Sequence, residues 1–526
     1  MPHGVSWILR CCAAIALFAL TAICLNQLAQ WQFTAHLRDT AARDLAMAAS
    51  GGTPWDWDFH RDSIVAGRVF GDAQADFSDD CLLVQSRGNP FEIGLHLPQL
   101  LPLREFPRLH LFAFANASAQ ARLVARERLD GGAWTSSPFP LAGASAPTDI
   151  DVEKVVWRAP DGTVQPAPAV VAMLRLRFSL PQGAVLQFNG ATLERPANFE
   201  RLDLSRKAAL AQPGAPVQID AIPVYRAPDG GFSAGQIATI SMSSPPILEL
   251  PKSPRVERRR QLLNSILDAL PAAIIVPQGA IDASFAQARS EATHSMSARA
   301  PAGPRWIALI LYAGGLLLAR LFPPRHPRWR ALLEIVLVLA GPLWLIAGGH
   351  FSGQIDAAQK FLIACVSVYS ISLGFPRDWK WNGSGRGWLL ASAVVALAVG
   401  IGLIVHFFAG GTMRPIGSAH VLRYFGWAMI QQYLVCVVCT SRWKLVAGSD
   451  AAAIWLGALG FALLHTPNAS LMLATFAGGL CWCTLYLRER ALLPLAVSHA
   501  TSALALIALL PPSWLYSAEV SARFFQ

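Results

Sequence analysis

The longest apolar run of the chain is WLLASAVVALAVGIGLIVHFFA, residues 388–409. It contains no Asp, Glu, Lys or Arg. About 20 apolar residues in a helix cross the hydrocarbon core of a bilayer, since each residue adds about 1.5 Å of length. The run therefore predicts a transmembrane helix, and it is long enough to cross a membrane on its own.

Similar runs lie on both sides of this one. Seven more occur in the same half of the chain, at residues 305–321, 332–349, 360–375, 421–440, 451–465, 470–487 and 491–511. Near the amino terminus, Val5 to Leu25 is apolar apart from Arg10, and no small-x-small cleavage site follows. We therefore expect an uncleaved anchor at residues 1–29 and a polytopic α-helical membrane bundle of about eight transmembrane helices at residues 305–526.

Composition and charge also indicate a membrane protein. Hydrophobic residues make up 53% of the chain and charged residues only 14%, against about 25% charged residues in soluble domains. The abundance of apolar side chains also excludes a disordered chain. The net charge of +10 comes from residues 301–526, which hold sixteen Lys and Arg against six Asp and Glu; residues 1–300 hold 27 of each sign. A basic excess confined to the apolar half predicts membrane loops and a bilayer partner, not nucleic acid.

Basic residues mark alternate loops between the apolar runs. Eleven of the sixteen fall in four such loops: Arg320, Arg325, Arg328, Arg330, Arg377, Lys380, Arg386, Arg442, Lys444, Arg488 and Arg490. The positive-inside bias assigns these loops to the cytoplasm. With nine helices in all, residues 30–304 and the carboxyl terminus then lie outside it. We predict a multi-pass protein of the bacterial inner (cytoplasmic) membrane.

Residues 30–250 follow a different pattern. Leu174 to Phe178 alternates strictly between apolar and basic residues, Pro181-Gln182-Gly183 predicts a turn, and a second alternating run begins at Leu186. This is typical of a β-hairpin with one buried face. Similar runs at residues 82–85, 108–114 and 122–126 predict an extracytoplasmic antiparallel β-sandwich, jelly-roll-like in its strand spacing. The aromatic stretch at residues 55–59 could stack on a carbohydrate or belong to the core.

Residues 251–304 connect this domain to the bundle. Leu263, Ile266 and Leu270 recur at helical spacing behind a basic run, and Pro271 ends the pattern. They predict a short amphipathic helix, either packed on the sandwich or lying on the membrane surface. From Ser284 to Pro304 the sequence is rich in Ala, Ser, Gln and Arg, which predicts a linker.

Eight of the nine cysteines lie in apolar runs, and only Cys81 lies in the polar region. This distribution predicts small buried side chains, not a disulfide framework.

Polar side chains in the apolar helices mark the candidate site, because a bilayer makes them costly. Gln431-Gln432 lies in the run 421–440, His465 ends the next run, and His499 lies in the last one. These imidazoles and carboxamides can converge in a polar cavity within the bundle. Taken singly, each histidine could equally be a hydrogen-bonded structural residue.

The spacing of Phe461-x-x-x-His465, followed by Pro467-Asn468, a helix with Gly478-Gly479 and then His499, resembles the CPBP family. These are the CAAX prenyl proteases and bacteriocin-processing enzymes, also called the Abi family of intramembrane endopeptidases. Their pattern is a pair of Glu with an Arg four residues after the second, then Phe-x-x-x-His, then His-x-x-x-Asn. The resemblance covers about residues 421–510 well, and the four preceding helices match only in number and hydrophobicity.

The resemblance implies an endopeptidase acting on membrane-associated or lipidated peptides, without a cofactor or metal. It implies two sets of site residues: catalytic His465, His499, Gln431 and Gln432, and substrate-binding Phe461, Asn468 and Ser502. In the family a carboxylate activates water, the histidines assist, and the Asn helps to stabilise the oxyanion.

The chain departs from the family pattern in its first motif. Gln431-Gln432 stands in place of the two glutamates, Cys436 in place of the arginine, and Ala503, next to Ser502, in place of the asparagine. A carboxamide cannot accept a proton from water at neutral pH, and loss of a general base costs about 10²–10⁴-fold in rate. The departures therefore favour a catalytically impaired pseudoprotease that binds a membrane peptide or lipid-linked ligand, as the alternative to an active protease.

Other residues do not replace the missing carboxylates in this sequence. We expect Glu334 to be an ion-paired residue at a helix start, close to Arg328 and Arg330. Two histidines are too few for a catalytic zinc, even though His406 is a conceivable third ligand. A third class of function is an envelope polysaccharide or export accessory that acts through the β-sandwich.

Overall fold

The computed structural model describes residues 3–52, 55, 57–58, 69–77, 81–97, 100–128, 131–141, 146–194, 201–214, 220–228, 230–240, 245–294, 303–351, 357–376, 378–409, 413–515 and 518–525. The chain divides into two compact units. The membrane unit consists of Met1–Phe33, Ser253–Arg260 and Pro301–Gln526. The sheet unit consists of Thr34–Lys252 and Gln261–Ala300.

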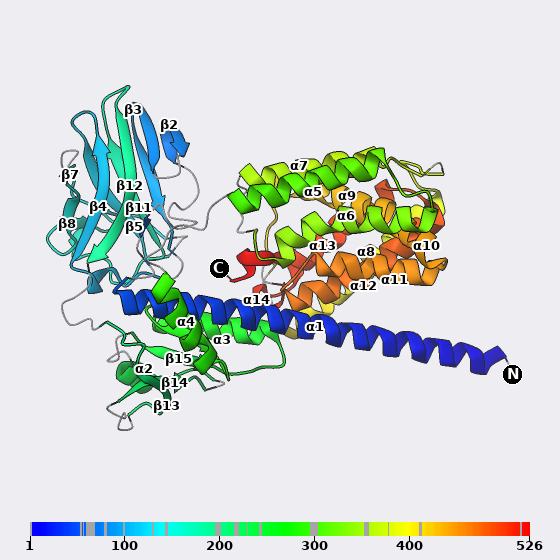
Figure 1. The fold of residues 1–526 in the computed structure, drawn as a ribbon, viewed down its shortest axis with the longest axis horizontal. Coiled ribbons are helices and arrows are strands. Elements are labelled where there is room, and N and C mark those ends of the chain that lie inside the picture. Colours follow the sequence, from blue (N-terminus) through cyan, green and yellow to red (C-terminus); the bar gives the residue numbers. More distant parts are fainter. Residues whose placement is uncertain are drawn as a thin grey trace. The chain divides into compact units, whose positions relative to one another are not determined.

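The membrane unit is a helical bundle (Figure 1). Its helices are the first part of α1 (His3–Ser50), α5 (Gly303–Leu321), α6 (Pro327–Ala347), α7 (Ala357–Ser372), α8 (Gly385–Ala409), α9 (Ser418–Gln432), η2 (Tyr433–Thr440), α10 (Ser441–Ala447), α11 (Asp450–Leu463), α12 (Ala469–Glu489), α13 (Leu493–Leu509), α14 (Pro512–Leu515) and η4 (Ser521–Phe525). A helix therefore occurs at the position of every predicted apolar run.

Five helical segments within the described residues are long and apolar enough to cross a membrane: Cys11–Ser50, Pro327–Ala347, Gly385–Ala409, Ser418–Ala447 and Ala469–Glu489. The apolar helices α7, α11 and α13 are shorter. These segments make the chain a membrane protein.

Close helix packing in the bundle depends on glycine. Helix α11 packs against α12, and α13 packs against α8 and α9. A Cβ atom at Gly479 of α12 would lie 3.0 Å from the Cα of Ala458 in α11. A Cβ at Gly457 of α11 would lie 3.0 Å from the Sγ of Cys483 in α12. Small residues let the two backbones approach closely, which is the usual way membrane helices gain contact area.

Glu334 is ion-paired, as predicted, but it lies within α6 and not at its start, because the helix begins at Pro327. It is buried in α6, where its Oε1 accepts from Arg330 Nε at 2.9 Å and its Oε2 from Arg442 Nε at 2.5 Å. Arg442 belongs to α10, so the ion pair joins α6 to α10. Both carboxylate oxygens are therefore occupied by arginines.

The larger sheet of the sheet unit is antiparallel, as predicted. Its strands are β1 (Trp57–Asp58), β2 (Phe70–Phe77), β3 (Leu82–Leu95), β4 (Arg108–Ala115), β5 (Gln120–Arg126), β6 (Trp134–Ser136), β7 (Phe139–Pro140), β8 (Thr148–Asp151), β9 (Trp157–Arg158), β10 (Val164–Gln165), β11 (Met173–Ser179) and β12 (Val185–Glu194). The order along its main path is β10-β9-β6-β5-β11-β3-β12-β4-β8. A short 3₁₀ turn, η1 (Leu103–Glu105), precedes β4.

The hairpin predicted at residues 174–188 is wrong. Strands β11 and β12 do not pair, because β3 lies between them: Leu176 pairs with Ile93 and Leu186 with Val84. The alternation itself was read correctly, since Leu174, Leu176 and Phe178 are buried. The loop passes over β3, where the amide of Gly183 donates to the Ser86 carbonyl at 2.8 Å. Local alternation predicts a strand but does not specify its neighbour.

One face of this sheet carries a charged cluster. Glu92 on β3 accepts hydrogen bonds from Arg175 at 3.0 Å and from Arg177 at 2.8 and 2.6 Å, both on β11. Burial raises the pKa of the Glu92 carboxyl, but the two arginines outweigh burial and hold the pKa below its ordinary value. The ion pairs therefore add stability at neutral pH, and this contribution is lost as the pH falls through the lowered pKa.

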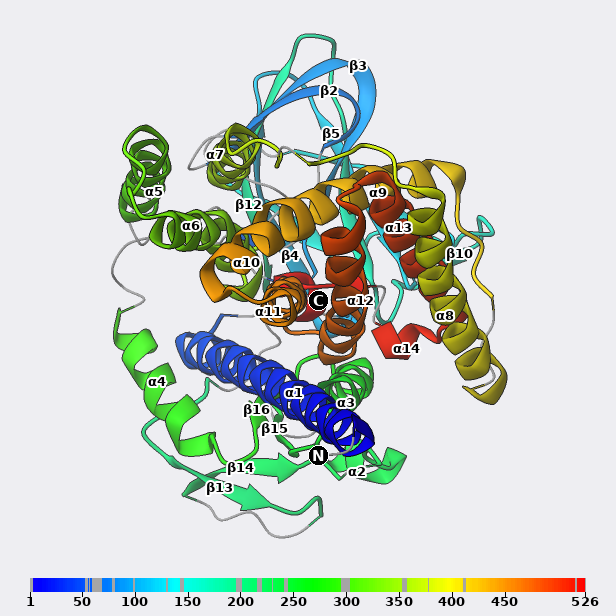
Figure 2. The same cartoon turned by 90° about the vertical axis from the view of Figure 1, so that its right-hand side faces the viewer.

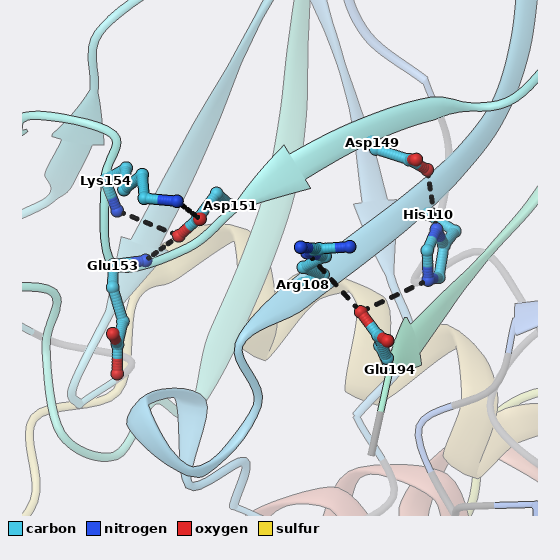
Figure 3. A network of polar contacts seen from close by, with 7 residues as sticks. All are labelled: Arg108, His110, Asp149, Asp151, Glu153, Lys154 and Glu194. Atoms are coloured by element: carbon cyan, nitrogen blue, oxygen red, sulfur yellow. Dashed lines mark hydrogen bonds and ion pairs between the residues drawn. The ribbon is translucent and has the colours of Figure 1, made fainter. Parts of the chain in front are cut away.

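Exposed polar pairs also join β4, β8 and β12 (Figure 3). The Nδ1 of His110 lies 2.6 Å from Asp149, and its Nε2 lies 3.8 Å from Glu194. Arg108 Nε lies 3.6 Å from the same Glu194 oxygen. Pairs this exposed contribute little to stability, because water and salt screen them. They lie on the solvent-exposed face of the sheet.

The aromatic stretch near residue 55 belongs to the core where it is described; Asp56 and Phe59 lie outside the described residues. Trp55 is buried and packs edge-on against Phe106, with ring centroids 5.3 Å apart. Trp57 is also buried, and its indole N–H donates to the His96 carbonyl at 2.6 Å. Neither indole ring is available to stack on a sugar.

A second, parallel sheet was not predicted. Its strands β13 (Lys207–Ala211), β14 (Ala221–Arg226), β15 (Ile247–Leu250) and β16 (Ile274–Pro277) pair in sequence order. They are accompanied by α2 (Ala234–Ile240), α3 (Val256–Ala269) and α4 (Ile281–His294). Residues 207–250 had been assigned to the antiparallel sandwich. All four residues of β15 and of β16 are buried, and buried parallel strands read as short apolar runs without alternation.

The linker predicted from Ser284 is also wrong as far as His294, because these residues belong to α4. A composition rich in Ala, Gln and Arg also favours a helix, because these residues are good helix formers. Phe285 and Ala288, one turn apart, are buried in a core with Ala42 and Leu45 of α1 and Val276 of β16. The amphipathic helix itself is confirmed as α3, with Leu263 and Ile266 buried.

Candidate functional site

The two predicted histidines lie beside the same phenylalanine. His465 follows the end of α11, and His499 lies in the middle of α13. The Phe461 ring is 4.9 Å from the His465 ring and 5.5 Å from the His499 ring between centroids, at interplanar angles of 90° and 87°. Figure 2 shows the bundle end-on, with α11, α12 and α13 next to one another. The structure thus brings His465, His499 and Phe461 together.

One hydrogen bond fixes the proton of His465. Its Nδ1 lies 2.8 Å from the carbonyl oxygen of Phe461, four residues earlier. A carbonyl oxygen only accepts, so Nδ1 carries the hydrogen. In the neutral ring the other nitrogen, Nε2, then has a free lone pair. His465 therefore presents a base.

A chain of two hydrogen bonds fixes the proton of His499 in the opposite way. The Sγ–H of Cys436 donates to Gln432 Oε1 at 3.0 Å, which orients the carboxamide. Its Nε2 then donates to Nδ1 of His499 at 3.1 Å. An amide nitrogen only donates, so Nδ1 of His499 is the acceptor and the ring hydrogen sits on Nε2. Gln432 and His499 are both buried. His499 therefore presents a donor.

The site offers one proton acceptor and one proton donor without a carboxylate. In the described part of the chain, no Asp or Glu side chain forms a hydrogen bond or ion pair with either ring. A buried imidazolium without an anionic partner is costly, so the buried ring of His499 is neutral. Attack of water on a carbonyl requires both a proton acceptor and a donor to the carbonyl oxygen.

An unusual helical segment positions Gln432 and Cys436. Helix α9 ends at Gln432, and the chain continues as a π-helix through η2, Tyr433–Thr440. The hydroxyl of Thr440 donates to the carbonyl of Val435 at 2.8 Å. A π-helical turn widens the helix and shifts the side chains that follow, and such turns are frequent at functional sites.

Two aromatic residues that the sequence reasoning missed surround His499. Trp482 lies 4.6 Å from the His499 ring, and its indole N–H donates to Ser498 at 3.1 Å. Tyr424 on α9 lies 6.3 Å away, edge-on. The signal for Trp482 was Gly478, one turn earlier: a Cβ at Gly478 would lie 2.6 Å from the indole ring. A glycine in an apolar helix indicated that a large ring lies beside it.

Among the remaining site residues, several have hydrogen-bonding groups without a partner among the described residues. Gln431 is half-buried, and its side chain forms no hydrogen bond with any described residue. Ser502 lies one turn after His499, and its buried hydroxyl has no partner among the described residues. Thr466, next to His465, has a buried hydroxyl in the same situation, and sequence reasoning missed it. Gln431, Ser502 and Thr466 therefore have groups available to a ligand.

Asn468 is occupied by structural hydrogen bonds. Its Oδ1 accepts from the amide of Leu471 at 3.1 Å and caps the amino terminus of α12. Its Nδ2 donates to the carbonyls of Leu515 at 2.8 Å and Glu519 at 3.2 Å. Both amide hydrogens are therefore used, and Asn468 holds the carboxyl-terminal segment against the His465 turn.

The donor set does not form a metal centre within the part of the chain that the structure describes. No group of three or more His, Cys, Asp or Glu with an arrangement that could hold a metal ion occurs there. The Nδ1 of His406, considered as a third ligand, lies 3.1 Å from the carbonyl of Leu509.

Comparison with known protein families gives one match. Residues 374–505 match the family described as Type II CAAX prenyl endopeptidase Rce1-like. The matched range includes His465, His499 and the residues around them, which together we call the two-histidine site. The match confirms the resemblance to the CPBP family. No curated protein matches the chain. No solved structure matches it either.

Proposed function

We propose that this chain, a membrane protein with a CAAX-protease-like endopeptidase domain at residues 374–505, binds a membrane-associated peptide at the two-histidine site and hydrolyses it slowly. The observation that carries the proposal is the opposite protonation of the two rings, with a free Nε2 on His465 and an Nε2–H on His499. Both rings lie against Phe461, within an apolar bundle.

The reaction follows from these two groups. The Nε2 of His465 accepts a proton from water as the water oxygen attacks the scissile carbonyl carbon. The Nε2–H of His499 donates to the carbonyl oxygen, where negative charge develops, and the Ser502 hydroxyl is a second donor. When the tetrahedral intermediate collapses, the C–N bond breaks and the His465 imidazolium returns its proton to the leaving amine. Phe461 and Trp482 exclude bulk water from His499.

The rate is expected to be low because the carboxylate of the family pattern is missing. In the family pattern a carboxylate activates the water, and here Gln431 and Gln432 stand in its place. General-base catalysis contributes about 10²–10⁴-fold. His465 accepts the proton of the water without the help of this carboxylate, and we therefore expect a slow enzyme.

The second candidate is a pseudoprotease, which binds the peptide or a lipid-linked ligand without cutting it. The absence of a carboxylate partner for either histidine in the described residues favours this candidate. An envelope polysaccharide or export accessory acting through the sheet unit is a third reading, for which the buried Trp55 and Trp57 offer no exposed aromatic platform.

Cleavage by the unmodified protein tests the proposal. Purified full-length protein in lipid vesicles is mixed with a fluorescent lipidated peptide, and the products are separated over hours. We expect slow cleavage, about 10²–10⁴-fold below that of a relative with both glutamates, and its loss in His465→Ala. The matched control is His406→Ala, which should cleave like the unmodified protein. Cleavage that persists in His465→Ala would contradict the role of this base, and peptide binding without any cleavage would establish the pseudoprotease instead.

We also propose the topology of a bacterial inner-membrane protein, with all nine apolar helices crossing the bilayer and with residues 30–304, which include the jelly-roll-like antiparallel sandwich, outside the cytoplasm. The support is the concentration of basic residues in alternate loops. Alkaline phosphatase fused after Gly183 or Gly231 should be active, and fusions after Arg328 should be inactive. The reverse pattern would show that the orientation is inverted.

A further inference from the structure

The sheet unit contains a cavity of about 390 Å³ that is separate from the two histidines. It lies where the four strands of the parallel sheet end. Its lining comprises Leu210, Arg226, Glu249, Lys252, Gln278, Gly279, Ile281 and Asp282. The first three are on β13, β14 and β15, and the last two are in the first turn of α4.

This position is the usual one for a ligand in a parallel sheet. Loops that follow the carboxyl ends of the strands lie at one edge, and α/β proteins bind ligands in the crevice there. Volumes of about 300–1,000 Å³ are typical of small-molecule sites. The size and place of the cavity therefore fit a small organic ligand.

Arg226 is held at the cavity by a buried carboxylate. Its Nε donates to Oε2 of Glu249 at 2.6 Å, and the other Glu249 oxygen accepts from the amide of Gly279 at 3.1 Å. Glu249 is buried, whereas half of the Arg226 side chain is exposed. Both oxygens of the Glu249 carboxylate therefore have hydrogen-bond partners within the protein. The carboxylate fixes the guanidinium, whose terminal N–H groups remain to bind a planar anion.

Further donors converge on the same space. Lys252 is exposed and forms no ion pair among the described residues. The Oε1 of Gln278 accepts from the amide of Lys252 at 2.8 Å, so its NH₂ group is directed elsewhere as a donor. Helix α4 starts at Ile281 directly after Ala280, which has no side chain able to cap it. Its first amides therefore add partial positive charge at the cavity.

The rest of the lining sets the character of the ligand. Leu210 is 52% exposed although it is apolar, and Ile281 is partly exposed beside it. Asp282 is the remaining acceptor, and it opposes a high negative charge on a ligand. We propose that the cavity binds a small organic molecule through a single carboxylate or phosphate group, with the apolar part of the molecule against Leu210 and Ile281.

Calorimetric titration of the full-length protein in an uncharged detergent tests this site. The probes are phenyl phosphate, benzoate and inorganic phosphate, each titrated also into detergent alone. We expect saturable binding of phenyl phosphate or of benzoate, and weaker binding of inorganic phosphate, which lacks the apolar part. The stronger of the first two shows whether the anionic group is a phosphate or a carboxylate.

Substitutions show whether binding takes place in this cavity. Lys252→Ala should weaken binding of the stronger probe about tenfold to a hundredfold, the effect of losing one charge-assisted hydrogen bond, and Asp282→Asn should strengthen it. Lys207→Ala, at the opposite end of β13, is the matched control and should bind like the unmodified protein. Arg226 is left intact, because its removal would leave Glu249 buried and unpaired. Absence of saturable binding, or equal binding by Lys252→Ala and Lys207→Ala, would overturn the proposal.

Discussion

Gln431→Glu should raise the rate of peptide cleavage about tenfold to a hundredfold over that of the unmodified protein. Position 431 corresponds to the first glutamate of the family pattern, and the half-buried Gln431 side chain forms no hydrogen bond with any described residue. A carboxylate there breaks no contact and restores the group that activates water in the family pattern, and general-base catalysis contributes about 10²–10⁴-fold in all. The gain is expected to fall short of that range because Cys436 and Ala503 still depart from the pattern.

The initial cleavage rate per inserted molecule is the quantity to measure. A carboxylate within a bilayer costs about 2.5–3.5 kcal/mol at a helix centre, so the yield of inserted protein must be determined for each variant. Gln431→Met is the matched control, since it fills a similar volume at the same position without adding a carboxylate. A gain of the same size in both variants, or no gain in Gln431→Glu, would show that a carboxylate at position 431 does not activate the reacting water.

Gln432→Glu should have the opposite effect and lower the cleavage rate about 10²–10³-fold. The two side chains have nearly the same shape, but a carboxylate cannot donate to Nδ1 of His499. The carboxylate instead accepts a hydrogen from Nδ1, so the neutral His499 ring loses its hydrogen at Nε2. The oxyanion then loses its donor, a loss that typically costs about 10²–10³-fold.

Gln432→Met separates this effect from simple disruption of packing. Methionine fills a similar volume and leaves His499 free to carry its hydrogen at Nε2, so this variant should cleave faster than Gln432→Glu. A Gln432→Glu protein that is as active as the unmodified protein, or more active, would contradict the assignment of His499 as the donor. Gln431→Glu and Gln432→Glu make the same chemical change at adjacent positions. Opposite changes in their cleavage rates would therefore come from the position of the carboxylate alone.

The helical half of the fold was largely predictable from the sequence. Apolar runs such as residues 388–409 and 470–487 coincide with α8 and α12, because a bilayer selects long apolar segments. The sheet unit was predictable only in part. The alternation at Leu174 to Phe178 predicted a strand, but the insertion of β3 between β11 and β12 depends on pairing over long sequence distances. The parallel sheet was missed because short apolar strands carry no period.

Only part of the candidate site was predictable from the sequence, and its hydrogen bonds were not. Motif spacing indicated His465, His499 and Phe461, which the structure places together. Which ring nitrogen carries a hydrogen depends on hydrogen bonds to Phe461 and Gln432, and no spacing rule gives these. Adjacent glutamines look equivalent in the sequence, yet about 100° of helical rotation separates them, and Gln432 is the one bonded to His499.

The opposite protonation of the two histidines is the central claim, and ¹⁵N NMR of the histidine rings in the full-length protein in lipid tests it most directly. Samples labelled with [¹⁵N]histidine are compared with His465→Gln and His499→Gln, so that the signals lost in each variant assign the two rings. We predict that His465 carries its hydrogen on Nδ1, bonded to the Phe461 carbonyl, and that Nε2 is unprotonated. We predict the reverse for His499, with Nδ1 unprotonated and bonded to Gln432. Hydrogens on the same nitrogen in both rings, or a hydrogen on Nδ1 of His499, would contradict the account.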